Sequence, residues 1–260
     1  MNVKFIKRTK FGYKFLLQST RYDVVNAIRR SIVGEVLTLA VDKVMVYKNE
    51  SVMPDEFIAH RLGLVPLNSR DFDEEKEVSL YLKKTGGVVK AGDIETNGIV
   101  EVTHKNIPIL VLNEGKSVEL ELVLKPGNGN QHTKWSSALV YYNNVPSIKQ
   151  HGKVDKSIIK TCPKGLLDFK ADKVVIRDPY DCDACRFCET ATHRNLELVT
   201  KEDEFVLTIE PYGNLDIDLI IKGASKYLED ELTSLGKEIK DIKWLANEGI
   251  FGGIPERSNG

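Results

Sequence analysis

The sequence predicts an α+β protein in which one domain is closed by both ends of the chain and two further domains are inserted into it. Three observations predict this organisation: strand and helix patterns alternate at both ends, the middle is mostly β-patterned, and all four cysteines lie in one late stretch. The expected boundaries are 1–46 plus 197–245 for the closing domain, 47–149 for a mainly-β insert, 150–196 for a cysteine domain and 246–260 for a flexible tail.

Length and charge narrow the class of function. The 260 residues can bury a substantial core, and 37 basic against 38 acidic residues leave a formal net charge of −1. A free-standing nucleic-acid-binding protein usually carries a basic excess, so any contact with DNA is expected to be indirect. The N-terminus lacks the apolar core of a signal peptide and no apolar run is long enough to cross a bilayer, so we expect a cytoplasmic protein without membrane contact.

The first expected elements are a β-hairpin and a helix. Apolar residues alternate over 3–17 around a turn at Gly12, which predicts two antiparallel strands. Apolar residues then recur at helical spacing over 23–35, which predicts a helix with one apolar face. That face carries Val24, Val25, Ile28, Ile32 and Val36, and the other side carries Asn26, Arg30 and Gly34.

The middle of the chain is expected to be rich in strands. A strand is predicted at 43–47, and a short helix follows that begins at Pro54 with acidic residues in its first turn and ends before Pro66. Residues 68–97 are expected to form loops around one strand. Four β-patterned stretches then run from 98 to 142, separated by Asn, Gly and Pro turns.

The C-terminal part adds a strand at 204–213 and a long helix from Asp216. The apolar residues of this helix are three, four or seven positions apart, which predicts one continuous apolar face. They are Ile217, Ile221, Ala224, Leu228, Leu235 and Ile239. The last residues of the chain are expected to be poorly ordered.

Three of the four cysteines, Cys182, Cys185 and Cys188, follow one another at three-residue steps. These steps match the first three positions of the bacterial ferredoxin run C-x2-C-x2-C-x3-C-P. Thr192 stands where the fourth cysteine of that run belongs. In a two-cluster ferredoxin the fourth cysteine of each run ligates the other run's cluster, so its loss does not break the site of the first three.

The end of a second run is present at Cys162-Pro163, twenty residues before Cys182. The first three ligand positions of that run fall on Gly152, Asp155 and Ile158. These three positions and Thr192 would all belong to one cluster, and the cysteines that remain are the complete set for the other. We therefore predict one iron–sulfur site held by Cys162, Cys182, Cys185 and Cys188.

The residues alone leave the identity of the metal open. Soft thiolate ligands suit an iron–sulfur cluster, and [4Fe–4S] is preferred because four cysteines complete its coordination. A [3Fe–4S] cluster is the alternative if Cys185, the middle ligand, is not used. Zinc is disfavoured because zinc ribbons usually present two paired knuckles. Disulfides or free thiols are the remaining alternative.

The cluster is expected to be structural. An electron carrier usually needs a partner cofactor or a second cluster, and this sequence has neither a complete dinucleotide fingerprint nor a second ligand set. A cluster can instead staple a domain whose own core is too small. A ferredoxin-type electron-transfer protein and a zinc-stapled interaction module are the rival functions.

Three segments carry a resemblance to a known family. The chain resembles the α-type assembly subunits of multisubunit RNA polymerases in VNAIRRSIVGEV followed by DEFIAHRLGLVPL, in KPGNGNQHTKWSSALVYY with its G-x-G-x-x-H-x-K-W pattern, and in EFVLTIEPYGNLDIDLIIKGASKYL. Within this family the sequence is most similar to the archaeal D-type members. Their relatives are bacterial α and the third-largest subunit of the eukaryotic nuclear enzyme.

The resemblance implies a function and partners. The two ends of the chain would form a dimerisation domain that pairs with a smaller α-like partner, the L subunit. The heterodimer would dock the large catalytic subunits, which hold the active site, and the small zinc-bearing N and P subunits. Partner-binding residues are expected on the first and last helices: Val25, Asn26, Ile28, Arg29, Arg30, Ile32, Ile221 and Leu228. For the polar three of these, a solvated helix face is the alternative.

Some archaeal members of this family carry a ferredoxin-like insert, and this sequence matches its one-cluster form. The resemblance implies that the cluster serves stability or assembly. Asp71, Asp73, Glu74 and Glu75 superficially resemble the magnesium-binding carboxylates of a polymerase. A charge run after a helix is usually a solvated loop, so we predict no magnesium site there.

Overall fold

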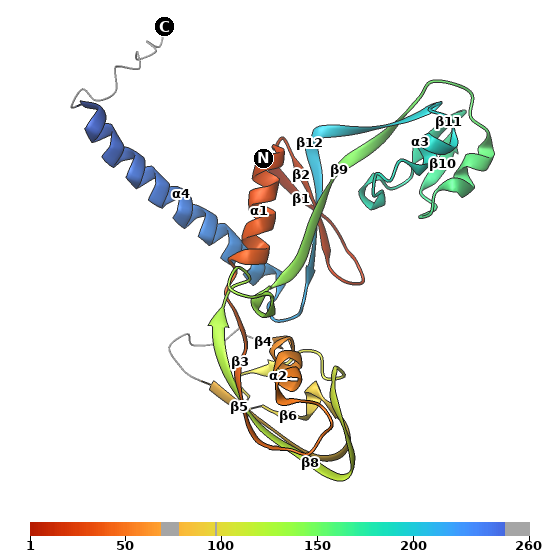
Figure 1. Cartoon of the computed structure of the whole chain (residues 1–260). Coiled ribbons are helices and arrows are strands. Elements are labelled where there is room, and N and C mark those ends of the chain that lie inside the picture. The colour runs from red at the N-terminus through yellow and green to blue at the C-terminus, as the bar shows by residue number, and fades with distance from the viewer. Residues whose placement is uncertain (69–77, 97, 248–260) are drawn as a thin grey trace.

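The chain folds into three units: a central unit, an insert and a cysteine module (Figure 1). The insert and the cysteine module project from the central unit in different directions, and a long helix projects in a third (Figure 1). The structure is a computed structural model that describes residues 1–68, 78–96 and 98–247, with 240–247 described by their backbone alone.

Each unit is built from segments that are separate in the sequence. The central unit comprises β1 (Asn2–Arg8), β2 (Tyr13–Gln18), α1 (Tyr22–Gly34), β9 (Ala138–Gln150), β12 (Leu196–Pro211) and α4 (Ile217–Asn247). The insert comprises β3 (Thr38–Asn49), α2 (Asp55–Gly63), β4 (Leu67–Asn68), β5 (Val78–Lys90), η1 (Ala91–Asp93), β6 (Ile94–Glu95), β7 (Glu101–Val102), β8 (Pro108–Gly127) and η2 (Thr133–Trp135). The cysteine module comprises η3 (Lys156–Thr161), β10 (Leu167–Lys170), β11 (Lys173–Ile176), η4 (Pro179–Asp181) and α3 (Phe187–Ala191).

An antiparallel sheet with strand order β1-β2-β12-β9 forms the middle of the central unit. Side chains alternate between the faces of a sheet, so Leu17 and Leu207 lie on one face and Leu16 and Val206 on the other. The helices α1 and α4 cover the face of Leu17, which we call the front face; the other is the back face. The front core holds Leu17, Val25, Ile32, Val36, Ala138, Val140, Phe205, Leu207, Ile209, Ile220 and Ala224.

The insert is built on a second antiparallel sheet, with strand order β3-β8-β5-β6. Every second residue of β8 from Val118 to Leu124 is buried, as expected for a strand with one face on a core. The helix α2 packs on this core through Ile58 and Leu62, which are fully buried. The insert thus has a core of its own, separate from the front core of the central unit.

The predicted hairpin, the strand at 43–47, the short helix and both longer helices are confirmed. Two details of the helices differ from the prediction. Val24, expected on the apolar face of α1, has 41% of its surface exposed. The helix α4 continues to Asn247, past the expected start of the flexible tail at 246, and residues 248–260 lie outside the described residues.

The strand β8 differs from the predicted pattern. Two strands with a turn over 113–117 were expected, but β8 runs unbroken from Pro108 to Gly127. It pairs with β5 on both sides of a register shift between Thr85 and Gly87. Thr85 pairs with Ser117 and Gly87 with Leu112, so the register shift falls on the turn-like sequence itself, and β8 is paired with β5 on either side of it.

The predicted divisions at 46/47 and 149/150 need correction, because both fall inside continuous strands. β3 begins at Thr38 and extends through the first division. β9, expected in the insert, pairs with β12 in the central sheet and extends to Gln150. A strand that passes from one unit to the next keeps one hydrophobic pattern, so the sequence carries no signal at the crossing.

The C-terminal end of α1 is completed by a segment about a hundred residues downstream. The last carbonyl groups of a helix have no partner within the helix. Here the Asn130 N–H donates to the carbonyl oxygen of Gly34 at 3.0 Å, and the Ser137 hydroxyl donates to that of Ile32 at 2.9 Å. The Ser136 hydroxyl reaches the carbonyl oxygen of Val33 at 3.4 Å. Residues 127–137 therefore form the cap of α1.

The same segment holds the insert. The Thr38 hydroxyl donates to the carbonyl oxygen of Trp135 at 2.6 Å, and the Trp135 indole N–H donates to that of Lys125 at 2.9 Å. Lys134 pairs with Asp42 on β3 at 2.8 Å, and the Lys134 side chain is only 13% exposed. The segment 127–137 thus joins α1 to both β3 and β8.

We predict that Gly129→Ala destabilises the chain. An added Cβ at Gly129 would lie 2.0 Å from the carbonyl oxygen of Val33, so the cap would have to move away from α1. Forced overpacking of this kind costs about 1–3 kcal/mol of unfolding free energy, measured by urea denaturation of the full chain. Gly236→Ala is the control: its Cβ would meet nothing, and stability should hold or rise by about 0.5–1 kcal/mol. Equal effects of Gly129→Ala and Gly236→Ala on stability would contradict the assignment of residues 127–137 as the cap of α1.

We predict that the Asp42–Lys134 pair stabilises the fold at neutral pH and less in acid. The hydrogen bond from Lys134 lowers the pKa of Asp42 below its ordinary value of 3.8. A carboxyl whose pKa is lowered by folding adds stability above its unfolded pKa, and this stability is lost as the pH falls through the folded pKa. Asp42→Asn should therefore destabilise the chain at pH 7, and the difference from the unchanged chain should shrink below about pH 4. A difference independent of pH would exclude a charge effect.

Candidate metal centre and partner interface

The cysteine module has few residues with which to form a core. Its buried residues are Ile158 on η3, Leu167 on β10, Val174 on β11 and Leu196 at the start of β12. Cys162 and Cys188 pack against this cluster as partly buried side chains. The cysteines are therefore part of the module's interior, and their surroundings are set by the hairpin of β10 and β11.

All four cysteines line one small cavity. Cys182 and Cys188 come from the loop and helix that follow η4, and Cys162 comes from the end of η3, twenty residues earlier in the chain. Cys185 is exposed, whereas the other three cysteines are half-buried. The residues that line the cavity are Cys162, Pro163, Leu166, Leu167, Ile176, Cys182, Cys185, Arg186, Phe187, Cys188 and Leu198.

Left-handed residues shape the loop that carries three of these cysteines. Ala184 has φ 51° and Arg186 has φ 58°, so left-handed residues directly precede and follow Cys185. This conformation costs a residue with a Cβ about 1–2 kcal/mol, and its occurrence away from glycine is a reason to look for function. The repeated reversal turns Cys182, Cys185 and Cys188 toward the same cavity.

Two of the thiols lie in partly desolvated surroundings. Burial raises the pKa of the Cys182 and Cys188 thiols above the ordinary value of 9.0. Both are therefore protonated at neutral pH in the metal-free chain, and binding a metal would release their protons. The Leu166 N–H donates to Cys162 Sγ at 3.4 Å. Such backbone donors stabilise the charge of a bound thiolate.

The side chains that line the cavity supply sulfur ligands only. Among the described residues, no three His, Cys, Asp or Glu side chains are close enough to hold one metal ion. A cluster spreads its thiolate ligands over several irons, so they lie farther apart than around a single zinc. Four cysteines around one cavity, with no histidine among the lining residues, form the donor set that such a cluster uses.

The four positions predicted to have lost a second cluster now serve other roles in the described module. Asp155 accepts a hydrogen bond from the Ser157 N–H at 2.8 Å and caps η3, and Ile158 is buried in the module core. The Thr192 hydroxyl donates to the carbonyl oxygen of Cys188 at 3.0 Å. These three residues line one polar cavity, and Gly152 lies beside it, against Asn195. The four cysteines line a different cavity.

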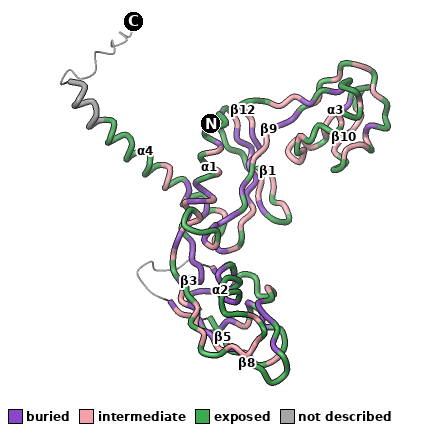
Figure 2. Tube along the Cα trace, in the orientation of Figure 1, coloured by how far each residue is buried: buried purple, intermediate pink, exposed green. Residues whose placement is uncertain are grey.

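An open apolar groove lies on the front face of the central unit. It has a volume of about 170 Å³ and runs between α1, α4 and the strands β1 and β2. Beyond the groove, α4 projects from the body of the chain, and its residues 229–239 are exposed (Figure 2). The lining residues are Met1, Val3, Phe15, Leu17, Ile28, Ser31, Ile32, Leu207, Ile209, Ile221, Ala224, Ser225 and Leu228.

The structure divides the apolar residues predicted to bind a partner into two groups. Ile28, Ile221 and Leu228 line the open groove, and 36% of the Ile221 surface is exposed. Val25 and Ile32 are 0% and 1% exposed and pack in the chain's own front core. Ile32 also forms part of the groove lining, whereas Val25 does not, and the partner roles predicted for both stay predictions.

The three polar residues predicted to bind a partner, Asn26, Arg29 and Arg30, lie on α1. Arg29 Nε donates to Asn26 Oδ1 at 3.1 Å, and both side chains are half-buried. Arg30 is exposed and lines a second cavity together with Glu35, Asn130 and Tyr227. This second cavity shares Leu228 and Ser31 with the groove, so the polar rim continues directly from the apolar surface.

Two further predictions concern a magnesium site and a membrane span. Asp71, Asp73, Glu74 and Glu75 lie outside the described residues. None of the described helices has an apolar stretch of the length that a bilayer requires. Sequence reasoning missed the contacts of Lys7 and Lys14 with residues 178–181, because no local pattern connects residues so far apart.

Comparison with known proteins identifies one family. A family model described as the RNA polymerase Rpb3/RpoA insert domain matches residues 44–140, which fall largely within the insert. The chain is 30% identical over 226 residues to DNA-directed RNA polymerase subunit Rpo3 of Methanobrevibacter smithii, covering 79% of this chain and 82% of that protein.

Two more relatives extend this similarity. DNA-directed RNA polymerase subunit Rpo3 of Methanothermobacter thermautotrophicus is 30% identical over 253 residues, covering 89% of this chain and 96% of that protein. DNA-directed RNA polymerase II subunit rpb3 of Dictyostelium discoideum is 30% identical over 268 residues, covering 85% of this chain and 89% of that protein.

We predict that Ala184→Gly stabilises the chain, because Ala184 has a left-handed backbone conformation that is unfavourable for a residue with a Cβ. Ala184→Gly removes the clash of Cβ with the backbone and should raise the unfolding free energy of the metal-free chain by about 0.5–1 kcal/mol. Ala27→Gly, at an exposed position within α1, is the control and should lower it by about 1 kcal/mol. Urea denaturation measures both, and the same sign for both would contradict the loop geometry.

Proposed function

Because this chain belongs to the Rpo3/Rpb3 family of DNA-directed RNA polymerase subunits, we propose that it is the assembly subunit that heterodimerises with the small α-like L subunit. It is a non-catalytic part of a polymerase whose active site lies in the large subunits. The heterodimer then docks the large catalytic subunits and the small zinc-bearing N and P subunits in the cytoplasm. Contact with DNA is indirect.

The observation that carries this proposal is the open apolar groove on the front face. An apolar surface of this kind in a soluble chain favours association, because burial removes it from water. The groove is formed by the two ends of the chain, through β1, β2, α1 and α4. These are the elements that the family resemblance assigns to dimerisation.

The groove has the anatomy of a protein interface. Ile28, Ile221 and Leu228 supply an apolar centre, and Arg29 and Arg30 supply a polar rim on α1. Interfaces of this type combine a desolvated apolar centre with a polar rim, and a few anchors carry most of the binding energy. The exposed outer residues of α4 continue the apolar surface: Leu232, Leu235 and Ile239 are 68%, 52% and 47% exposed.

We further propose that the cysteine module holds one iron–sulfur cluster through Cys162, Cys182, Cys185 and Cys188. The bound cluster would supply cross-links between η3, the cysteine loop and α3, which the small module core cannot supply. A [4Fe–4S] cluster uses all four thiolates. A [3Fe–4S] cluster is the second candidate, because Cys185 is exposed and its loss leaves three half-buried ligands.

We predict that Ile221→Asp weakens the heterodimer. A carboxylate in the desolvated centre of the interface has no partner, and burying it costs several kcal/mol. Affinity for the small α-like subunit should fall by more than about tenfold, as measured by isothermal titration of the two purified proteins. Val111→Asp is the matched control, since Val111 is 66% exposed on the insert and should not affect binding.

Three results would contradict the proposed interface or the assembly role. Unchanged affinity of Ile221→Asp would remove the groove from the interface. An equal loss for Val111→Asp would point to general destabilisation. If the unchanged chain bound no small α-like subunit, the assembly role itself would fall.

We predict that the chain purified without oxygen contains iron and sulfide, about four of each per chain. Cys162→Ser and Cys188→Ser should abolish the cluster, seen as loss of visible absorbance and of iron. Cys185→Ser should leave about three irons if the three-iron form can be held. Asp155→Asn, at a position that carries no cysteine, is the control and should leave the iron content unchanged.

The same measurement separates the rival functions. Zinc without visible absorbance would favour a zinc-stapled interaction module. Reduction of the cluster by a cellular reductase, at a potential within reach of the cell, would favour electron transfer. An unchanged iron content in Cys162→Ser would show that the four cysteines are not one ligand set.

A further inference from the structure

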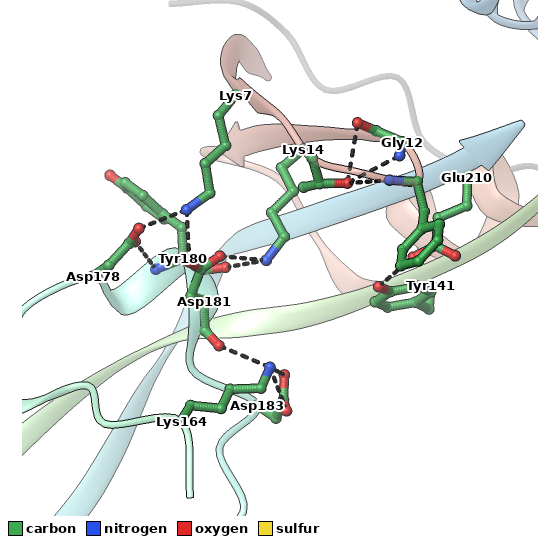
Figure 3. Close-up of polar contacts among 12 residues, drawn as sticks. Lys7, Gly12, Lys14, Tyr141, Lys164, Asp178, Tyr180, Asp181, Asp183 and Glu210 are labelled. Carbon is green, nitrogen blue, oxygen red and sulfur yellow. Dashed lines mark hydrogen bonds and ion pairs between the residues drawn. The ribbon is translucent and has the colours of Figure 1, made fainter. Parts of the chain in front are cut away.

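A short segment before the cysteine triplet is bound to another unit of the chain. Residues 178–181, which we call the strap, directly precede Cys182 and reach the hairpin of β1 and β2 (Figure 3). Lys7 on β1 donates to Asp178 Oδ2 and to Asp181 Oδ2, at 2.7 Å in each case. One ammonium group therefore holds both ends of the strap.

A second lysine from the neighbouring strand holds the same segment. Lys14 Nζ on β2 donates to Asp181 Oδ1 at 2.8 Å and to the carbonyl oxygen of Tyr180 at 2.9 Å (Figure 3). The Lys14 side chain is 14% exposed, so water screens this pair less than it screens a surface ion pair. The two carboxylate oxygens of Asp181 thus have one lysine each.

The strap also makes an apolar contact with the central sheet. Tyr180 packs with Ile6 against a small buried cluster formed by Leu16, Val145 and Val206. Leu16 and Val206 belong to the back face of the sheet, whereas their neighbours Leu17 and Leu207 belong to the front core. The strap therefore covers the face opposite to the partner groove.

A third lysine links the strap to the other end of the ligand set. Lys164, two residues after Cys162, donates to the carbonyl oxygen of Asp181 at 3.1 Å and to Asp183 Oδ1 at 2.6 Å. Asp181 and Asp183 lie on either side of Cys182 in the sequence. Contacts from the central unit and from the segment of Cys162 thus converge on the residue before Cys182.

The strap is a second attachment between the cysteine module and the central unit. The first is a two-stranded ribbon, in which residues 146–150 of β9 pair with residues 196–200 of β12. The register of the pairing shifts between Thr200 and Phe205, where the ribbon joins the central sheet, and an irregularity of this kind bends and twists a strand. The strap adds side-chain contacts to β1 and β2, so the position of the module relative to the central unit does not depend on this ribbon alone.

We propose that Lys7 and Lys14 are positioning residues for the cysteine site. Through the strap they fix the backbone before Cys182, so the ligand set is organised partly from the central unit. Groups that orient metal ligands without binding the metal themselves typically change metal affinity by about 10–100-fold when they are removed. This inference rests on the proposed iron–sulfur site and adds residues to it from a separate unit of the fold.

The chemistry of the contact sets the form of the test. An isolated ion pair at a surface contributes little, but Lys7 and Lys14 form a network with two carboxylates and a carbonyl group. Lys7→Met and Lys14→Met keep most of the unbranched side chain and remove the ammonium group. Lys14→Arg keeps the charge and should preserve most of the contact. Lys10→Met, on the turn of the same hairpin, is the matched control outside the strap.

The experiment compares the rate at which full-length chains lose their cluster to a ferrous-iron chelator under argon, followed by visible absorbance. The double variant Lys7→Met with Lys14→Met should lose its cluster at least about tenfold faster than the unchanged chain. Lys10→Met and Lys14→Arg should stay close to the unchanged chain. Hydrogen exchange of residues 178–182 in the iron-free chains gives a second readout, and it should be faster in the double variant alone.

The outcomes separate this inference from the proposed function. An unchanged loss rate in the double variant overturns the positioning role, even if exchange in the strap rises, because the strap would then be structural only. Equal acceleration by Lys10→Met also overturns it. If the unchanged chain carries no cluster, the proposed iron–sulfur site and this inference fail together. Faster loss and faster exchange confined to the double variant support it.

Discussion

The fold depends on hydrogen bonds that the C-terminal end of α1 cannot make for itself. The carbonyl oxygens of Ile32 and Gly34 are bound by Ser137 and Asn130, which follow them by about a hundred residues. This donor segment returns from β8 and also binds β3, so the helix is complete only when the insert has folded back onto it. The cap therefore fixes the position of α1. Because residues of α1 line the partner groove, the cap also helps to set the shape of that groove.

The central sheet carries a different surface on each face. Phe15 and Leu17 of β2 line the partner groove, while the intervening Leu16 packs against the cluster beneath the strap. The alternation of side chains along a strand lets one short segment serve both surfaces. A change in β1 or β2 that moved the backbone would therefore act on the groove and on the cysteine module together. The partner groove and the contact surface of the strap therefore lie on opposite faces of the same strands.

The cysteine module shows why a small unit benefits from a metal. Its core has four buried residues, far fewer than the insert, and two of its cysteines complete that core. Left-handed Ala184 and Arg186 add strain that so small a core offsets poorly. The strap, the ribbon and the proposed cluster are three constraints on the same loop. Each restricts conformations that the module's own apolar contacts leave open.

The sequence by itself determined most of the elements and the family, because these follow from local patterns: helical periodicity in α1 and α4 and the G-x-G-x-x-H-x-K-W segment. The three-residue steps among the cysteines predicted a ligand set, and the structure shows that all four cysteines line one cavity. The sequence could not show that β9 joins the central sheet, that Val25 is fully buried in the chain's own core, or that Lys7 contacts Asp178 across 171 positions. Periodicity shows which residues share a face of one element. Only the tertiary structure decides what that face meets, because pairing, capping and ion contacts between distant segments form when the chain closes on itself.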